Sequence, residues 1–558
     1  MVAYLTEYLK NNRLLIFFFV IFFFLRLPLL DHAFLLRGER DITLTGYALA
    51  KTGKDLYGNF LPLQFLGLDM PTPFLAFYYS ALWWLIIPIK SVFTARLPYI
   101  FISSFNLIFI YELIKIITKN KKLAIISTVI FCFSPGIYHL SRLALEVNLA
   151  TPLLLLAMVL YLRQKKMISW FIFILAFFTY NGFRPLIPFL IVYLEWWLFL
   201  TKKRDSISRP DRSVGTPSRM TFVKNISVAL IAYLLICLIA LQFIDGQMMK
   251  SRSSDLVFIG YESINPLVDL RRNTAVGPTI LKQITNNKIT NTVYYIIEVF
   301  FEGQSLDYLF LKGDKAAIYA TTFTGQFFVI ALLFYYLGII NLGKLWKKEY
   351  FYILGFIPIA LIPSLINIDY ISIAIRSILA SVSYAMIIGL GLILFWDLIK
   401  QTNKIFRITI YLLLITIASI ELSYFSYNYF FRRPVTMFES FFESEKQIAQ
   451  YLTGSDKKLV IYDDSPKNIM TAYYLINSKV NIDDLQRLLQ QENNYKFDNY
   501  LLKRCPDSGK KQQMFKKGSI ISDACLDKDQ YDKLNDDGNV DKIKFKDYSF
   551  RTAYFVIN

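Results

Sequence analysis

The chain has 558 residues, of which 55% are hydrophobic and 17% aromatic, and its mean hydropathy is +0.40. This composition excludes an ordinary soluble protein, and repeated apolar runs of about 17 residues or more indicate a polytopic membrane protein. The formal charge of +19 does not indicate nucleic-acid binding. Residues 430–558 hold 21 basic and 19 acidic residues, so most of the excess positive charge lies in the membrane part. There it is explained by the retention of positively charged loops on the cytoplasmic side.

The first apolar run, residues 14–30, predicts a retained membrane span. It is long for a signal peptide, and no small-residue cleavage site follows it. Further apolar runs follow, so residues 1–428 are expected to form an α-helical polytopic membrane domain with about eleven transmembrane helices. The predicted spans are 14–30, 97–116, 122–138, 147–163, 168–183, 185–201, 225–244, 322–342, 350–367, 377–397 and 408–428.

Clusters of Lys and Arg in the short connections predict the topology, because positive loops stay on the cytoplasmic side. With a cytoplasmic N-terminus and about eleven spans, every cluster falls on that side. The clusters lie at 115–122, 163–166, 202–224, 344–348 and 400–407. Segment 73–89 is apolar enough to span, but counting it would move every later cluster outside. We therefore interpret it as a juxtamembrane or re-entrant segment on the outer side.

Three longer segments are then extracytoplasmic: the first outer loop, 31–96, with juxtamembrane helices; an outer loop, 246–321; and a C-terminal domain, 429–558. The last is predicted to be a small α/β domain. Its expected helices are MFESFFESEKQIAQYL and SPKNIMTAYYLI, and its expected strands are KLVIYD and YSFRTAYFVI. Cys505 and Cys525 are expected to pair if this domain is exported.

The stretch GERDITLTGYALAKTGKD, residues 38–55, places Glu39, Arg40 and Asp41 just after the first span. A structural interpretation makes Asp41 the N-cap of a short helix and pairs Glu39 with Arg40. A functional interpretation makes one carboxylate a general base at the water–membrane boundary, which takes a proton from an acceptor hydroxyl or amine. The sequence leaves both open.

Three arginines, Arg142, Arg184 and Arg376, each stand at the predicted outer end of a span. A guanidinium offers a planar fork that suits phosphate oxygens, and together the three predict a phosphate site. The alternatives are contact with lipid headgroups, or pairing with Glu146 and Asp369.

Other chemistry has little support. The chain has two histidines, His32 and His139, so a histidine-rich metal cluster is excluded. His139, near Ser141 and Arg142, is interpreted as a polar interfacial residue or a site residue. No P-loop and no Gly-rich dinucleotide motif occurs between a strand and a helix.

The segments RLPYIFISSFNLIFIYELIK, FSPGIYHLSRLALEVNLA and AIRSILASVSYAMIIGLGL, with an acidic first outer loop before them, resemble the GT-C membrane glycosyltransferases. The chain is similar to the dolichyl-phosphate-mannose–protein mannosyltransferase and bacterial lipid A aminoarabinose transferase families. This resemblance, over roughly residues 10–400, implies a GT-C-like fold, a polyprenyl-phosphate sugar donor and a reaction on the outer side of the membrane.

The resemblance also implies site residues. The families' Asp-Glu pair falls near residues 38–41: alignment on KTGKD places Gly38 and Glu39 there, and alignment on the local RD places Asp41 there. Asp41 is the expected base, with Glu39 as the alternative and Arg40 beside them.

Two further motifs bear on the same site. In LDMPTPF the families' lysine before Pro-Pro is absent and Asp69 lies nearby, so donor-phosphate binding is assigned to the three arginines. SRLALE makes Arg142 and Glu146 site candidates. The acids Asp41, Glu39 and Asp69 could hold a divalent cation, although a monophosphate donor does not require one.

The sequence therefore predicts an integral-membrane glycosyltransferase of the cell envelope. It would move a sugar from a polyprenyl-phosphate donor to a protein, lipid or glycan acceptor outside the membrane, without nucleic acid as a partner. The alternatives are a transporter or flippase of lipid-linked sugars, which would carry charges along its path, and a non-catalytic assembly factor of the cell envelope.

Overall fold

The structure is a computed structural model, and it describes most of the chain. The residues described are 13–63, 65–66, 71–208, 219–242, 261–345, 348–367, 372–455, 457–477, 481–491, 494–497, 499–506, 514–538, 540–544 and 551–557. Asp69 and the beginning of the predicted outer loop 246–321 lie outside these residues.

The described chain forms two compact units, and each is discontinuous in sequence. The membrane unit comprises Met1–Arg26 and Tyr99–Ser426, and the composite unit comprises Leu27–Pro98 and Tyr427–Asn558. The structure thus groups the first outer loop with the C-terminal tail. The domain boundary predicted at 428/429 stays a prediction.

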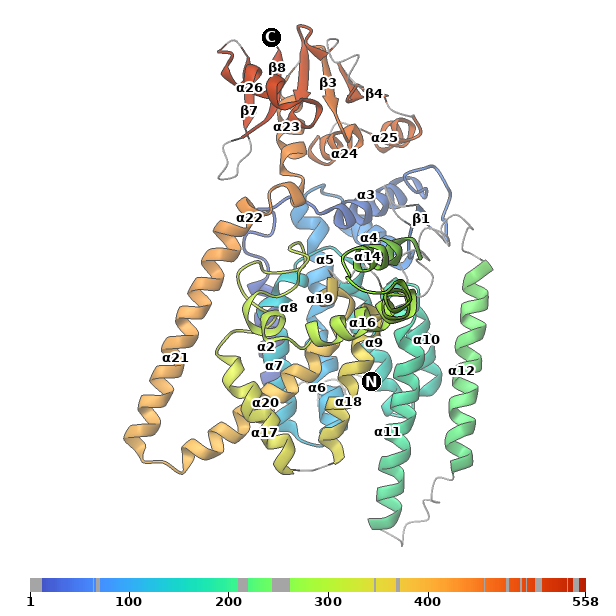
Figure 1. The fold of residues 1–558 in the computed structure, drawn as a ribbon, viewed down its shortest axis with the longest axis vertical. Helices are drawn as coiled ribbons and strands as arrows, with labels where there is room; N and C mark the ends of the chain where they lie inside the picture. The colour runs from blue at the N-terminus through green and yellow to red at the C-terminus, as the bar shows by residue number, and fades with distance from the viewer. Residues whose placement is uncertain are drawn as a thin grey trace. The chain divides into compact units, whose positions relative to one another are not determined.

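The membrane unit is helical (Figure 1). Its longer helices are α2 (Arg13–Leu25), the part of α5 (Val92–Ser104) from Tyr99 on, α6 (Asn106–Thr118), α7 (Lys121–Cys132), α9 (Glu146–Leu162), α10 (Lys166–Phe177), α11 (Leu186–Ser208), α12 (Arg219–Gln242), α14 (Tyr261–Asn273), α16 (Lys288–Glu302), α17 (Ala331–Leu345), α18 (Lys348–Leu365), α20 (Ala380–Lys400) and α21 (Lys404–Tyr427). Short helical turns are α8 (Pro135–Leu140), η1 (Asn181–Phe183), α15 (Thr279–Thr285), η2 (Asp307–Leu311) and α19 (Ile373–Arg376).

Among the described residues, three helical segments are long and apolar enough to cross a membrane: Val92–Thr118, Ala380–Lys400 and Lys404–Thr436. Eight shorter apolar helices accompany them. The helical, membrane-type fold is therefore confirmed. The count of eleven spans and the orientation of the termini stay predictions.

Helices α17 and α20 approach each other so closely that only glycine fits at two positions. A Cβ on Gly391 would lie 1.7 Å from the Phe334 carbonyl oxygen, and one on Gly338 would lie 1.9 Å from the Ile387 carbonyl oxygen. Small residues allow such backbone approach where helices pack in lipid.

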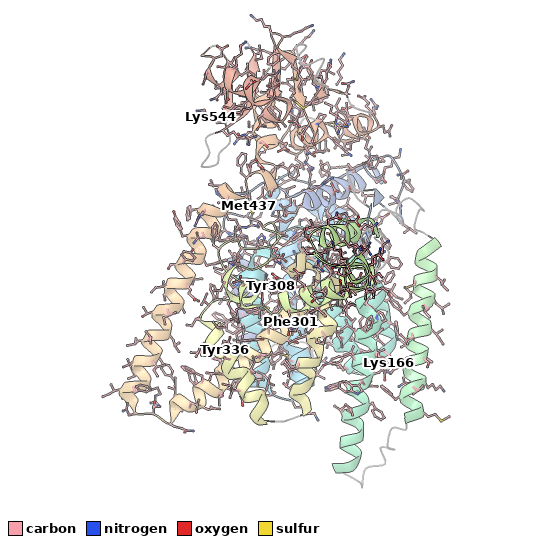
Figure 2. The ribbon with its side chains drawn as sticks, viewed as in Figure 1. Lys166, Phe301, Tyr308, Tyr336, Met437 and Lys544 are labelled. Atoms are coloured by element: carbon pink, nitrogen blue, oxygen red, sulfur yellow. A yellow bond between two sulfur atoms is a disulfide. The ribbon has the colours of Figure 1, made fainter. Side chains whose placement is uncertain are left out.

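Two acids of the membrane unit have structural partners. Lys166, labelled in Figure 2, forms an ion pair with Glu195, which also accepts a 2.5 Å hydrogen bond from the Tyr161 hydroxyl. Glu421 accepts hydrogen bonds of 3.0 and 3.2 Å from the Ile330 amide at the start of α17, where the helix dipole favours a negative charge.

The composite unit joins the first outer loop to an α/β domain (Figure 1). The loop holds α3 (Arg37–Thr52), β1 (Phe65–Leu66), β2 (Pro71–Thr72) and α4 (Leu75–Ile86), and the first residues of α5 follow. The tail holds η4 (Asn428–Arg432), α22 (Arg433–Thr436), η5 (Glu439–Phe441), α23 (Glu443–Thr453), β3 (Leu459–Asp463), α24 (Pro466–Ile476), α25 (Ile482–Leu489), β4 (Asn494–Phe497), β5 (Tyr500–Arg504), β6 (Ser519–Ser522), η7 (Asp523–Cys525), α26 (Lys528–Asp536), β7 (Asp541–Lys544) and β8 (Thr552–Ile557).

The six described strands of the tail form one sheet in the order β4-β5-β3-β6-β8-β7, in which β3 runs parallel to β5 and β6. Both predicted strands are confirmed as β3 and β8, and both predicted helices as α23 and α24. One core covers the α23–α25 face of the sheet and includes Phe34, Leu44, Ala48 and Leu56 of the first loop. The loop and the tail therefore share a hydrophobic core.

The opposite face of the sheet has a smaller core around Tyr462, Met514, Ile521 and Cys525. Cys505 and Cys525 form a disulfide here, with their Cα atoms 5.2 Å apart. The predicted pairing is confirmed, and the export from which it was inferred stays a prediction.

Candidate functional site

Helix α3 carries the acidic stretch. It begins at Arg37, where the Leu36 amide donates to Glu39 Oε2 over 2.9 Å, and ends at Gly53, whose φ of 69° is the left-handed conformation of a helix C-terminus. The interpretation of Asp41 as an N-cap is therefore wrong, because Asp41 lies in the second turn of the helix.

Glu39 is fully buried and is held by Arg96. Arg96 Nε lies 2.8 Å from Glu39 Oε1, and Arg96 Nη2 lies 2.7 Å from Oε2. The other donors of Arg96 reach the carbonyl oxygens of Leu30, Ala33 and Phe34 at 2.7–2.8 Å. All five N–H groups of the guanidinium are thus used, and the pair fixes the entry of the loop into α3.

Arg40 joins α3 to the tail. Its Nη2 lies 2.8 Å from Asn468 Oδ1, and its guanidinium carbon lies 4.4 Å from the centre of the Phe442 ring. Phe442 has a φ of 52°, which is rare for a bulky residue. Asp41 follows on the same helix with a side chain that is only 6% exposed.

Arg142 belongs to a basic cluster in the membrane unit. Its Nη1 lies 3.0 Å from the Tyr138 hydroxyl, and its side chain is buried. Arg26 is the second guanidinium of this cluster, and its guanidinium carbon is 5.1 Å from the centre of the Tyr138 ring. Its Nε donates to Ser141 Oγ over 2.5 Å, and Nη1 and Nη2 donate to the carbonyl oxygens of Phe22 and Cys132 over 3.0 and 2.6 Å. His139 is buried, and its Nε2 lies 2.8 Å from the Ile318 carbonyl oxygen.

The other two predicted arginines, Arg184 and Arg376, lie at other helix ends of the membrane unit. Arg184 is half-buried after η1, with its Nε 3.3 Å from the Phe177 carbonyl oxygen. Arg376 is half-buried at the end of α19, a turn that Asp314 holds by accepting the Ala374 amide over 2.5 Å. Glu146 is the first residue of α9 and half-buried. The convergence of the arginines on one anion stays a prediction.

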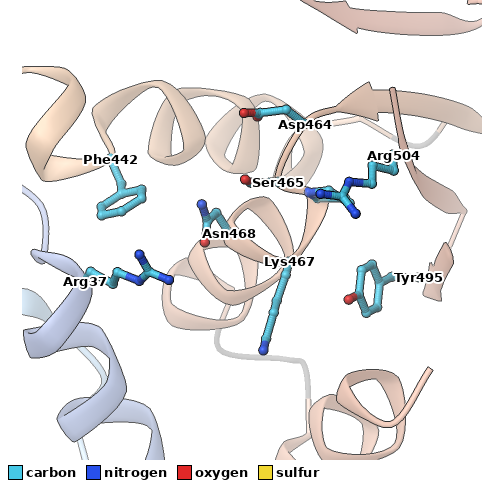
Figure 3. A pocket seen from close by; sticks show the side chains of 9 residues that line it. Arg37, Phe442, Asp464, Ser465, Lys467, Asn468, Tyr495 and Arg504 are labelled. Carbon is cyan, nitrogen blue, oxygen red and sulfur yellow. The ribbon is translucent and has the colours of Figure 1, made fainter. Parts of the chain in front are cut away.

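A pocket of about 300 Å³ opens in the composite unit (Figure 3). It lies at the carboxyl ends of the parallel strands β3 and β5, beside the first turn of α24, and the start of α3 contributes to it. Its lining residues are Arg37, Phe442, Asp464, Ser465, Pro466, Lys467, Asn468, Tyr495 and Arg504. The lining thus combines three cations, two aromatic rings and several hydrogen-bonding groups.

Asp463, next to the pocket residue Asp464, is an unusual acid. Burial raises its pKa to about 7, and the charge of Asp464 contributes to the rise. Its oxygens accept the Ser465 amide over 2.8 Å and the Tyr554 hydroxyl over 3.1 Å. Asp463 is therefore partly protonated near neutral pH.

Sequence reasoning missed two residues of these sites. Arg26 was detectable, because an arginine inside a predicted apolar span marks a buried functional or structural charge. Arg96 had no such signal: it lies 57 positions from Glu39, and no periodicity connects them. Within the described residues, no group of three His, Cys, Asp or Glu side chains could hold a metal ion, and the metal candidate Asp69 lies outside them.

No family model and no curated protein matches the chain. Solved structures do resemble its fold. ArnT from Cupriavidus metallidurans, bound to undecaprenyl phosphate, is 11% identical, with 98% of both chains covered and a TM-score of 0.40. The same protein in the apo state gives 11% identity, the same coverage and a TM-score of 0.37.

The archaeal oligosaccharyltransferase AglB from Archaeoglobus fulgidus, in complex with an inhibitory peptide and a dolichol-phosphate, is 14% identical. The match covers 83% of this chain and 64% of that one, with a TM-score of 0.40. Likenesses with TM-scores of 0.37–0.40 carry no residue roles over to this chain.

Proposed function

We propose that the chain is a membrane glycosyltransferase that moves a sugar from a polyprenyl-phosphate donor to an acceptor outside the membrane. The observation that carries the proposal is the basic cluster of the membrane unit, where Arg26 and Arg142 are both buried against Tyr138. Burying two guanidiniums in an apolar helical unit is costly, and such charges mark functional sites.

The donor phosphate would lie at Arg142 of this cluster, with Arg26 as a supporting residue, because all three nitrogens of Arg26 donate to protein acceptors. A guanidinium matches the oxygens of a monophosphate and stabilises the charge that grows on it as the bond to the anomeric carbon breaks. Arg184 and Arg376 are proposed as further phosphate ligands, with His139 and Glu146 close in sequence to the cluster.

The base is assigned to Asp41. Both oxygens of Glu39 are bound by Arg96, so Glu39 has a structural role, and Arg40 connects α3 to the tail. Arg96 has no donor left for Asp41. A buried carboxylate that this guanidinium does not bind can accept the proton of the attacking hydroxyl or amine as the sugar transfers in a single displacement.

The transporter alternative predicts charges along a path through the membrane unit. The two acids that it would use, Glu195 and Glu421, serve as an ion-pair partner and a helix cap. This supports the transferase over the transporter.

The test uses the purified chain in nanodiscs with a panel of undecaprenyl-phosphate sugars, and the assay follows release of undecaprenyl phosphate. Asp41→Asn should abolish release while undecaprenyl phosphate still binds. Arg142→Ala should weaken that binding by about tenfold or more, the cost of a lost charged hydrogen bond. Arg163→Ala, which removes a half-exposed guanidinium paired with Glu112, is the matched control. Full turnover by Asp41→Asn would refute the base assignment, and unchanged binding by Arg142→Ala would refute the phosphate site.

A further inference from the structure

The pocket of the composite unit is distinct from the basic cluster proposed for the donor phosphate. Arg37 enters it from α3, Lys467 from the first turn of α24, and Arg504 from the end of β5 (Figure 3). The two catalytic candidates of α3 do not line it. It therefore needs an explanation of its own.

The charges of the pocket point to an anionic ligand. Three cationic side chains and one acid, Asp464, line a cavity of about 300 Å³, and the Lys467 ammonium also donates to the Tyr57 hydroxyl over 3.2 Å. Arg504 is an exposed residue that lines the pocket, and no hydrogen bond or ion pair joins its side chain to another described residue. The carboxyl ends of parallel strands are also where ligands bind in open α/β sheets.

The remaining lining residues point to a sugar rather than to a bare anion. The rings of Phe442 and Tyr495 supply apolar faces, and Ser465, Asn468 and Asp464 supply hydrogen-bonding groups. Most of the Tyr495 side chain is buried, whereas its hydroxyl is accessible and makes no hydrogen bond with any described residue. The hydroxyl can therefore donate a hydrogen bond to a ligand in the pocket.

The helix places this pocket beside the proposed base. Arg37 and Asp41 are four residues apart on α3, so their side chains project from the same face, about 6 Å apart along the axis. The Cα atoms of the two residues are therefore about one helical turn apart, and Asp41 itself is buried and does not line the pocket. This adjacency favours the acceptor as the occupant.

We propose that the pocket is an acceptor subsite that binds a sugar unit carrying a phosphate or carboxylate group. The arginines and Lys467 hold the anion, the two aromatic rings contact the sugar faces, and Asp464 and Asn468 accept or donate hydrogen bonds to hydroxyls. The assignment as acceptor rests on the proposed transferase function, whereas the binding of an anionic sugar does not.

The experiment measures equilibrium binding to the full chain in nanodiscs. The probes are glucose 6-phosphate, glucuronate, glucose, inorganic phosphate, geranyl phosphate and a hexaglutamate peptide. The two anionic sugars should bind at least tenfold more tightly than the other four. Arg504→Ala should weaken their binding by about tenfold or more, and Tyr495→Phe should weaken it by a smaller factor. Arg487→Ala, which removes an exposed arginine of the same domain, is the matched control and should change nothing.

Each other outcome overturns the proposal. Equal binding of inorganic phosphate would indicate a plain anion site, equal binding of geranyl phosphate would indicate the lipid carrier, and equal binding of the peptide would indicate a protein partner. Unchanged binding in Arg504→Ala, or in Arg504→Gln if the alanine variant does not fold, would remove the pocket from the interaction.

Asp41→Asn separates the two proposals. It should lose transfer and keep binding of glucose 6-phosphate. If no variant or wild-type preparation transfers a sugar but the anionic sugars still bind through Arg504, the proposed function fails and the binding site stands. If transfer occurs and the anionic sugars do not bind, the binding site fails and the transferase stands.

Discussion

Replacement of Glu39 by Gln is expected to unfold the composite unit at a much lower temperature without acting on the chemistry directly. The change removes the carboxylate that both Nε and Nη2 of Arg96 bind, and Glu39 is fully buried. Arg96 is then a buried guanidinium without its counter-charge.

The magnitude follows from this geometry. Removing one partner of a buried ion pair costs about 3–5 kcal/mol. For a unit of roughly 200 residues, each kcal/mol lowers Tm by about 2–4 °C, so the expected fall is about 6–20 °C. Arg96→Met should be at least as damaging, because it also leaves the carbonyl oxygens of Leu30, Ala33 and Phe34 without their donors.

The assay is thermal unfolding of the full chain in nanodiscs, followed by tryptophan fluorescence. Trp84 reports on this unit, because it is buried with its ring centre 5.5 Å from that of Tyr47. Asp484→Asn, which removes the charge of an exposed acid of the same unit, is the matched control and should change Tm by no more than about 2 °C. The double variant Glu39→Gln/Arg96→Met should be no less stable than Arg96→Met alone, since it removes a carboxylate that would be buried and unpaired. A Glu39→Gln protein with the Tm of the wild type and no transfer would refute the structural role of Glu39.

Three further predictions concern stability. Burial holds the folded pKa of Asp463 at about 7, above its unfolded value of about 3.9. The folded state therefore loses about 4 kcal/mol of stability as pH rises from about 4 to 7. Asp463→Asn should remove this loss, so the difference in Tm between pH 5 and pH 8 should be smaller than in the wild type. Gly391→Ala should abolish folded protein in membrane extracts measured by size exclusion, because its Cβ would overlap the Phe334 carbonyl. Cys505 and Cys525 should resist maleimide labelling in membranes until reduced, and the double serine variant should lose about 3 kcal/mol of stability in denaturant unfolding; labelling without reductant would refute the exported disulfide.

Local patterns predicted the parts of the fold that depend on neighbouring residues. The apolar runs predicted the helical membrane unit, and the alternation in KLVIYD and YSFRTAYFVI predicted β3 and β8. The edge strands β4 and β7 are each four residues long: β4 (NYKF) alternates polar and aromatic residues over too short a stretch, and β7 (DKIK) has one apolar residue. They therefore carry little signal that a single sequence reveals.

The composite unit could not be predicted for a different reason. Leu44 and Ala48 share a core with residues of α24 and β8, more than 400 positions away. Such contacts follow from the tertiary fold and leave no periodicity in either segment. The same holds for the pocket, whose Arg37 and Arg504 come from opposite ends of the chain.

The acid of α3 shows how the structure sharpens a question that the sequence left open. In the alignment on KTGKD, the Asp-Glu pair of the families that the sequence resembles falls on Gly38 and Glu39. Because α3 already begins at Arg37, positions 38 and 41 are three residues apart within one helix and project from the same face. Asp41 can therefore replace an acid missing at position 38, displaced by about 4.5 Å along the helix axis.

This geometry predicts a rescue. Asp41→Asn should abolish sugar release, and Gly38→Asp in the same chain should restore part of it, because the new carboxylate projects from that face one turn earlier. Gly38→Asn/Asp41→Asn is the matched control, since it adds the same bulk without a charge and should stay inactive. Restoration by Asp but not by Asn at position 38 would show that the reaction needs a carboxylate on this face of α3. Equal activity of the two double variants, or none in either with Tm unchanged, would mean that the base does not lie on this face and that the displaced-acid assignment is wrong.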